Sequence, residues 1–289
     1  MTLDKKIINE ISYKAEKALT QELHTTPKYG LVCPISCGSH SDMDYKTFIN
    51  AIAALKQHFG QFAEYAFFNA DKSDLSDLLA VLRPLGRKAE KAMLEATKGV
   101  NTHKGALFCL GLACSAIGYL LAKQKEVTLS NISQTIKTMC YKLSKKEFAS
   151  VTQKEFPTHG EQMYIKYGVL GARGLGERGY EEVIKIYVPL LDKLYKIHDK
   201  NQAHSRLLAK IAAQTEDVNI IYRSDYDTLL LAQEKCAKLF EDYSVTSAQR
   251  LNEWFIEKNI SCGGSADLLS LTLFLYEINK ENKKMQKIK

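Results

Sequence analysis

Apolar residues recur at every third or fourth position along most of the chain, which is the spacing of amphipathic α-helices. Ile7, Ile8, Ile11, Ala15 and Leu19 form such a stripe near the N-terminus. Further helices are predicted near residues 48–59, 74–97, 103–123, 130–146, 159–170, 180–195, 202–213, 225–241, 246–257 and 266–279. The only candidate for a strand is "VNIIY" at 218–222. The pattern therefore predicts an all-α protein.

The chain offers few signs of internal division. It contains five prolines, and it lacks a Gly/Ser-rich linker and an internal repeat. We therefore expect a single compact domain over residues 1–279, followed by a basic tail over 280–289. Pro189 lies inside the stripe at 180–195, where it should kink the helix because it cannot donate a backbone hydrogen bond.

One segment has no formal charge over eighteen residues, from Gly105 to Ala122. A membrane span needs about 20 mainly apolar residues, so this run is at the lower limit. It is rich in Gly, Ala, Cys and Ser, and glycines recur at 105, 111 and 118, which suits close helix packing. We predict that 103–123 is the buried central helix and does not span a membrane.

Charge and cysteine usage narrow the functional classes. The formal net charge is +7, but "KENKKMQKIK" at 280–289 carries +4 of it, which leaves little for a nucleic-acid surface. The seven cysteines include no CxxC pair, and the N-terminal segment does not resemble a signal peptide because Asp4 and Glu10 interrupt its apolar pattern. A cytoplasmic protein with reduced thiols is expected, with small polyanions as possible ligands.

Polar clusters stand where several helices should begin: "CGSHSDMD" (37–44), "NTHKG" (101–105), "PTHGEQ" (157–162) and "SCGGSADLL" (261–269). Helix N-termini present free backbone donors that suit phosphate groups, and Gly-Gly lets a backbone approach a ligand closely. The simpler interpretation is that Ser, Thr and Asp are helix caps, as Thr158 and Glu161 would be in a capping box.

Several kinds of catalytic site can be weighed from these residues. Asp42, Asp44, Glu161, Asp217 and Asp267 supply the oxygen ligands that Mg²⁺ prefers. Three histidines could bind zinc, but the chain has no HExxH motif. It also lacks GxSxG and GxxxxGK[ST], and "GARGLG" at 171–176 follows a helical stretch where a nucleotide-binding loop would follow a strand. The histidines are His40, His103 and His159.

Taken in order, the segments "GSHSDMD", "LRPLGRKAE", "GVNTHKGA", "THGEQMYIKYGVLGARG", "EDVNIIYR" and "GGSADLL" closely resemble the triphosphoribosyl-dephospho-CoA synthases. The resemblance runs from Pro27 to Leu275. It implies a pentosyltransferase that joins ATP to 3'-dephospho-CoA and releases adenine. In that reaction the ribose 2'-hydroxyl of dephospho-CoA attacks the anomeric carbon of ATP's ribose. The product becomes the prosthetic group of the acyl carrier protein of citrate lyase or malonate decarboxylase.

The chain departs from the family's usual pattern at two places. Cys33 stands where an aspartate is usual, and Leu175 stands where a glutamate is usual, with Glu177 two positions later. Two alternatives therefore stay open. The chain could be a diverged relative that hydrolyses the glycosidic bond of ATP or another nucleotide, or a non-catalytic nucleotide-binding helical protein.

Cleavage of an N-glycosidic bond gives the sugar oxocarbenium character, so the site needs a carboxylate to activate the acceptor and a donor for the leaving base. Asp42, Asp44, Glu161 and Asp267 are candidates for the first role, and the three histidines for the second. Mg²⁺ on the triphosphate would be held by Asp42, Asp44 and Asp267. We expect the substrates, ATP and dephospho-CoA, to contact Lys28, Asn101, Lys104, His159, Arg173, Arg223, Gly263, Gly264 and Ser265.

These candidates make a geometric prediction. If they form one active site, seven of them should line one cavity, although they lie far apart in the sequence. The capping interpretation predicts that the helix starts are dispersed. The seven are His40, Asp42, Asn101, Lys104, His159, Arg173 and Asp267.

Overall fold

The computed structural model describes residues 3–72, 74–149 and 151–286. Helices account for most of them, and the sole β-type pairing in these ranges is an isolated bridge between Cys33 and Ser36. The helices are α1 (Lys5–His24), α2 (Tyr45–Asn69), α3 (Leu78–Ala96), α4 (Lys104–Ala122), α5 (Leu129–Met139), α6 (Leu143–Phe148), α7 (His159–Tyr167), α8 (Gly171–Glu177), α9 (Val188–Leu194), α10 (Lys200–Ala212), α11 (Val218–Arg223), α12 (Tyr226–Glu241), α13 (Val245–Glu257) and α14 (Gly263–Gln286). The all-α prediction is confirmed.

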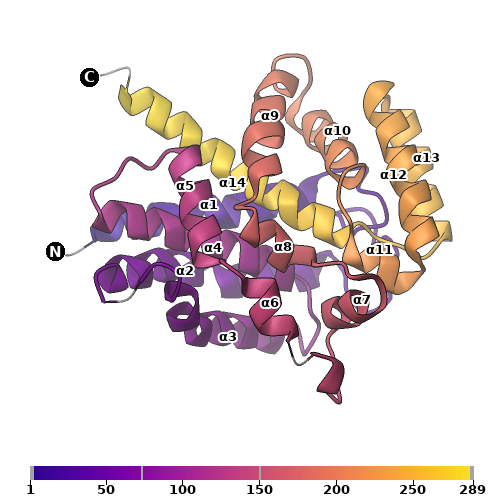
Figure 1. The fold of residues 1–289 in the computed structure, drawn as a ribbon. Helices are drawn as coiled ribbons and strands as arrows, with labels where there is room; N and C mark the ends of the chain where they lie inside the picture. Colours follow the sequence, from indigo (N-terminus) through magenta and orange to yellow (C-terminus); the bar gives the residue numbers. More distant parts are fainter. Residues whose placement is uncertain (1–2, 73, 150, 287–289) are drawn as a thin grey trace.

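Helix α4 is the buried centre of the fold, as its uncharged sequence predicts. It packs against α2, α3, α5, α8 and α14 (Figure 1). Among the described residues it is the one helix long and apolar enough to cross a membrane, but 72% of its apolar window is buried inside the protein. Close packing depends on Gly118, since a Cβ there would lie 1.9 Å from the carbonyl oxygen of Ala63 in α2.

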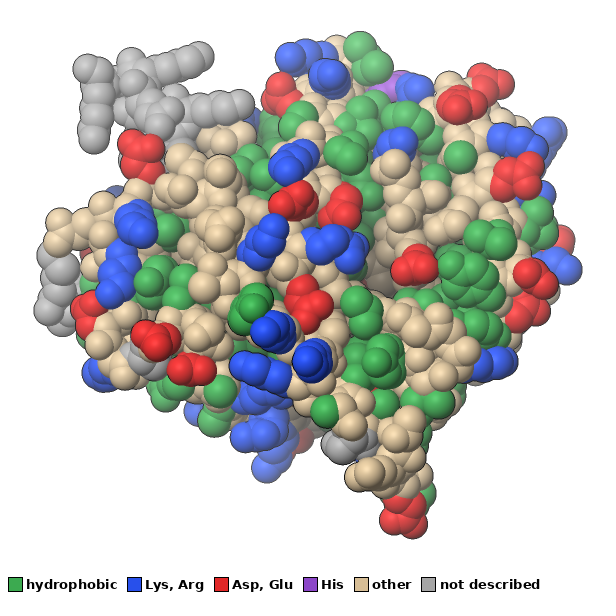
Figure 2. Space-filling view, in the orientation of Figure 1, with side chains coloured by type: hydrophobic (Ala, Val, Ile, Leu, Met, Phe, Trp, Pro, Cys, Tyr) green, Lys and Arg blue, Asp and Glu red, His purple; other side chains and the backbone are tan. Residues whose placement is uncertain are grey.

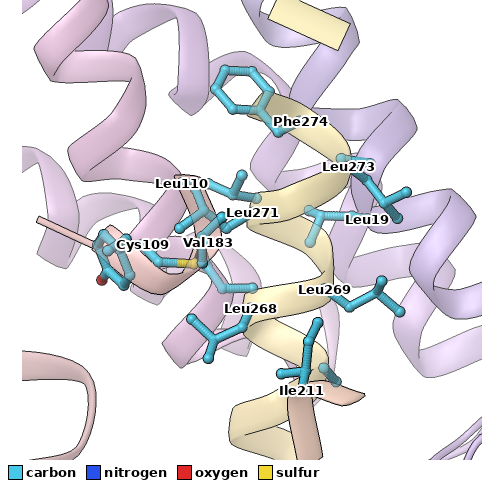
Figure 3. Packing of buried hydrophobic residues seen from close by; sticks show 14 of the residues in the cluster. Leu19, Cys109, Leu110, Val183, Ile211, Leu268, Leu269, Leu271, Leu273 and Phe274 are labelled. Carbon is cyan, nitrogen blue, oxygen red and sulfur yellow. Dashed lines mark hydrogen bonds between the residues drawn. The ribbon is translucent and has the colours of Figure 1, made fainter. Parts of the chain in front are cut away.

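Helix α14 closes the other side of this core. Figure 3 shows leucines of α14 extending toward Cys109 and Leu110 of α4 and toward Leu19 of α1. These side chains are all buried. Helices α1 and α14 pack together, so residues from both ends of the chain contribute to the same core. The spacing of apolar residues in the sequence does not reveal this contact.

Four sequence predictions require correction. "VNIIY" is helical, because Asp217 caps α11 by accepting a hydrogen bond from the backbone N–H of Asn219 at 3.0 Å. The segment 130–146 is two helices, separated at Lys142, whose φ of +56° is left-handed. The helix expected over 159–170 ends at Tyr167 because Gly168 adopts a φ of +73°, and α8 follows it.

The fourth correction concerns the C-terminus. Helix α14 does not end near residue 279 but continues to Gln286, and Glu281 forms an ion pair with Lys14 of α1. Most of the expected basic tail is therefore helical, while 287–289 lie outside the described residues. Pro189 is the second residue of α9, and a π-helical segment, η2 (Val183–Tyr187), directly precedes that helix. The backbone therefore widens just before the proline, and the expected kink stays a prediction.

Candidate functional site

The starts of α2, α4, α7, α11 and α14 converge on a cavity of about 350 Å³. It is completed by the loop that joins α1 to α2. Ten of the candidate residues line it, and they come from segments up to 239 positions apart in the sequence: Lys28, His40, Asp42, Asn101, His103, Lys104, His159, Arg223, Gly263 and Asp267. Six of the seven residues expected to share a cavity do so, and Arg173 does not.

Asp267 is a partly buried carboxyl group in the wall of the cavity. It lies against the first turn of α4, where the nearby backbone N–H of Ala106 acts to lower its pKa. Gly105 makes this approach possible, since a Cβ at that position would lie 1.9 Å from Asp267 Oδ2. Burial raises the pKa of Asp267 well above its ordinary value, and the nearby carboxyls of Asp217 and Glu22 add to the rise. The folded protein therefore favours the protonated form of Asp267.

A buried ion pair forms another part of the cavity wall. Lys28 Nζ lies 2.7 Å from Glu22 Oε1, and both side chains are almost fully inaccessible to solvent. The Lys28 ammonium also donates to the carbonyl oxygen of Val32 at 2.9 Å. Burial raises the pKa of Glu22, and Lys28 partly offsets that rise. Breaking such a pair leaves a charge buried without its partner, so Lys28 is held firmly in place.

His40 is oriented by Arg223, which also lines the cavity. Arg223 Nη2 lies 3.0 Å from His40 Nδ1, and Nη1 donates to the carbonyl oxygen of Ser39 at 2.8 Å. Because a guanidinium only donates, His40 Nδ1 accepts, and the imidazole proton belongs on Nε2. Burial and the Arg223 charge lower the pKa of His40 to about 4. His40 is therefore a neutral hydrogen-bond donor at neutral pH, with Asp42 Oδ1 3.8 Å from its Nδ1.

His103 precedes α4 and is also neutral, since burial and the Lys28 charge lower its pKa to about 3. Its Nδ1 lies 3.1 Å from Thr102 Oγ1, and its ring packs edge-on against Phe48. Its Nε2 is buried and has no hydrogen-bond partner among the described residues. A buried polar atom without a partner is costly, so this nitrogen is suited to a ligand group.

Asp217 was a candidate metal ligand, but in the structure it accepts hydrogen bonds from the start of α14. Its buried carboxylate accepts hydrogen bonds from the backbone N–H groups of Gly264 at 3.2 Å and Ser265 at 2.8 Å, and from the Ser265 hydroxyl at 2.9 Å. It also caps α11, so one side chain joins the starts of α11 and α14. The backbone donors expected to bind phosphate at Gly264 and Ser265 are thus occupied within the protein.

Three other candidates lie outside the cavity. Asp44 is an exposed N-cap whose carboxylate accepts from the Thr47 backbone at 2.8 Å, in a capping box. Glu161 accepts from the Thr158 backbone N–H at 2.7 Å, and the capping box predicted there is confirmed. Burial would raise the pKa of Glu161, but hydrogen bonds from Lys154 and Thr158 outweigh burial and lower it to about 2. Arg173 pairs with Glu147 at a neighbouring cavity.

Comparison with known proteins identifies the family. Residues 8–286 match the CitG family, described as ATP:dephospho-CoA triphosphoribosyl transferase. The chain belongs to this family. It is 36% identical over 274 residues to the 2-(5''-triphosphoribosyl)-3'-dephosphocoenzyme-A synthase of Pectobacterium atrosepticum. The alignment covers 94% of this chain and 90% of the relative.

Proteins of the same description, marked as probable, occur in Vibrio cholerae and Streptococcus equi. The first is 36% identical over 93% of this chain and 88% of its own length. The second is 34% identical over 94% of this chain and 97% of its own length. No solved structure matches the chain. The chain is therefore a triphosphoribosyl transferase that acts on ATP and dephospho-CoA, and the family resemblance seen in its motifs is confirmed.

The two departures from the family pattern lie away from the chemistry of the cavity. Cys33 is buried and forms the backbone bridge with Ser36, and Leu175 packs against the core. Glu177 accepts a hydrogen bond from the Ser144 backbone at 2.8 Å, near the start of α6. None of these three side chains lines the cavity that contains Asp267.

Among the cavity residues that sequence reasoning missed are Glu22, Asn219 and Tyr222. Glu22 lies in the last turn of α1, two positions before its final residue, where a carboxylate looks like an exposed residue. Tyr222 and Asn219 belong to the segment that we expected to be a strand. Tyr222 stacks on His159 with ring centroids 3.6 Å apart, which gives the cavity an aromatic platform. The motif "EDVNIIYR" was the available signal for both α11 residues.

Proposed function

We propose that this cavity is the active site of the triphosphoribosyl transfer and that it holds the reacting sugars of ATP and dephospho-CoA. The observation that carries the proposal is the partly buried Asp267 carboxyl, which lies beside the first turn of α4 in the same cavity as the His40–Arg223 pair. A carboxyl group with a raised pKa and a more exposed carboxylate in one cavity match the acid and base that glycosidic-bond chemistry requires.

In the proposed reaction the bond between adenine and ribose C1' breaks, and a bond forms between C1' and the 2'-oxygen of dephospho-CoA. Asp267, whose pKa is raised by burial, donates a proton to the departing adenine. Asp42, which is more than half exposed at the rim, accepts the proton of the attacking hydroxyl. Asp267 gives one proton to adenine and Asp42 takes one from the 2'-hydroxyl. The protons balance when Asp42 then releases its proton to solvent and Asp267 takes one up from solvent.

Cationic and neutral donors would bind the phosphates. Arg223 and the Nε2–H of neutral His40 offer oriented donors at one wall. Lys104 is half exposed and pairs with Glu90 at 2.6 Å, so it can exchange that surface partner for a phosphate at little cost. The outer face of the His159–Tyr222 stack is suited to an adenine ring.

Magnesium would enter as part of the ATP substrate. The described residues contain no group of three or more His, Cys, Asp or Glu side chains arranged to hold a metal ion. Asp44 is committed to its helix cap, so the three-aspartate site expected from the sequence does not form. Mg²⁺ is commonly held by one or two carboxylates and substrate phosphates, and Asp42 is the accessible carboxylate here.

The further biological setting is part of the same proposal. The product would be transferred to an acyl carrier protein as its prosthetic-group precursor, and the reaction would occur in the cytoplasm, where ATP and dephospho-CoA are available. The proposal takes the chain as a single catalytic domain, with α14 extending to Gln286.

The test is adenine release measured by chromatography. Purified protein with ATP, Mg²⁺ and dephospho-CoA should release adenine and form one larger triphosphate-bearing product, with little release when dephospho-CoA is omitted. Asp267→Asn should lower the rate of release by about 10²–10⁴-fold, the usual contribution of a general acid. Rapid release without dephospho-CoA would indicate a hydrolase, whereas ATP binding without any release would indicate a non-catalytic binder.

A further inference from the structure

A second cavity of about 360 Å³ adjoins the proposed active site, and both are lined by Lys104 and Gly105. Its walls come from α2, α3, α4, α6 and α8. This volume is within the range of about 300–1,000 Å³ that is typical of small-molecule sites. A ligand that reacts beside Asp267 can therefore extend past Lys104 into this second cavity.

The floor of the second cavity is apolar. Phe62 of α2, Leu82 of α3, and Leu107 and Leu112 of α4 are buried there. Such a floor does not suit the triphosphate of ATP, because burying an uncompensated charge among apolar side chains is unfavourable. It suits an uncharged chain that carries apolar groups.

One polar group interrupts that floor. Ser115 is fully buried in the middle of α4, and its hydroxyl has no hydrogen-bond partner among the described residues. A buried helical serine can bond to the carbonyl four residues earlier, but Ser115 does not, so its hydroxyl is available to an amide or hydroxyl of a ligand in the cavity that Ser115 lines.

The rim of the second cavity is basic. Figure 2 shows Lys and Arg side chains gathered over the region of α3 and α6. Arg83 and Arg173 at this rim both pair with Glu147, while Arg87 forms no ion pair within the part of the chain that the structure describes. Lys104 lines both cavities and Arg87 lines the second, so both cations are available to a diphosphate that enters the second cavity past Lys104.

We propose that the second cavity binds the pantetheine arm of dephospho-CoA, with the diphosphate at Lys104 and Arg87. This inference rests on the proposed active site, because it requires the acceptor hydroxyl to react in the first cavity. Pantetheine is an uncharged chain with a branched apolar segment, two amides and a hydroxyl, and a diphosphate joins it to adenosine. That order of groups matches the apolar floor, Ser115 and the basic rim.

The arm-binding site is tested by filling it. Gly86 of α3 lines the second cavity, and a Cβ there would meet no atom within 4 Å, so Gly86→Leu should fold normally. It should raise the KM for dephospho-CoA by about tenfold or more while the KM for ATP stays within about twofold. Lys91→Leu is the matched control, because it places the same side chain on an exposed position of α3.

Ser115→Ala tests the hydroxyl separately. It breaks no protein hydrogen bond, so it should keep the thermal midpoint of unfolding while it raises the KM for dephospho-CoA. In the wild type, 4'-phosphopantetheine should compete with dephospho-CoA and not with ATP, and Gly86→Leu should abolish that inhibition.

The outcomes separate this inference from the proposed function. Normal KM values for dephospho-CoA in both variants, with full turnover, would overturn the arm-binding site and leave the active site intact. If the wild type released no adenine, calorimetric binding of 4'-phosphopantetheine would still measure the second cavity directly. Binding that Gly86→Leu does not change would then refute it.

Discussion

Replacing Gly105 by alanine would displace the Asp267 carboxyl without changing any titratable group. The new Cβ would lie 1.9 Å from Asp267 Oδ2, and ordinary contact begins near 3.4 Å, so the oxygen must retreat by about 1.5 Å. A misplacement of about 1 Å in an active site can lower the rate by about 10²-fold. We therefore expect Gly105→Ala to slow adenine release by about 10²-fold or more.

The variant should remain folded. Alanine gains up to about 1 kcal/mol of helix propensity over glycine, and overpacking costs about 1–3 kcal/mol. For a chain of 289 residues the unfolding entropy is about 0.6 kcal/mol/K, so a net loss of 2 kcal/mol lowers the thermal midpoint by about 3 °C. Adenine release and the midpoint should be measured on the same preparation.

The matched control is Gly160→Ala. Gly160 is the second residue of α7, as Gly105 is the second residue of α4, and its Cβ would meet only Arg173 Nη1 at 3.8 Å. It should retain the wild-type rate. If Gly105→Ala also retained a rate within about threefold of the wild type, the position of the Asp267 carboxyl would not matter, and its assignment as the acid would be refuted.

Four further predictions concern titratable groups in and around the cavity. Asp267→Asn should not lower the thermal midpoint at pH 7. Burial raises the pKa of Asp267 in the folded protein, so above the ordinary pKa of 3.8 the unfolded chain ionises this group more readily and is stabilised relative to the folded protein. A fall of several degrees in the midpoint would contradict this. Lys28→Met should lower the free energy of unfolding by about 3–5 kcal/mol, since it leaves Glu22 buried without its partner, and adding Glu22→Gln should restore most of the loss in denaturant titrations. Asp217→Ala should cost about 2–4 kcal/mol by leaving buried N–H donors unsatisfied, and an unchanged midpoint would show that the clamp between α11 and α14 is dispensable. Because the pKa of His40 is lowered to about 4, His40 should not titrate near pH 6.5. The pH–rate profiles of the wild type and of His40→Gln should therefore have the same shape around pH 6.5, and a limb there that His40→Gln removes would contradict this.

Local patterns in the sequence were enough for the elements and for part of the site. The uncharged run from Gly105 to Ala122 predicts its own burial, because an apolar helix without a polar face has to be covered on all sides. The pairing of Thr158 with Glu161 is likewise decided within one helical turn. The family motifs drew attention to most residues that line the cavity, including His40 and Asp267.

Contacts between distant segments were decided only by the tertiary structure. Asp217 looked like a metal ligand until its donors at the start of α14 were visible, 47 and 48 positions away. Arg173 belongs to a family motif, yet its contact with Glu147 places it at the neighbouring cavity. The physical reason is that the free energy of a buried polar group depends on the partners that the fold brings to it, and those partners leave no periodic signal in the sequence.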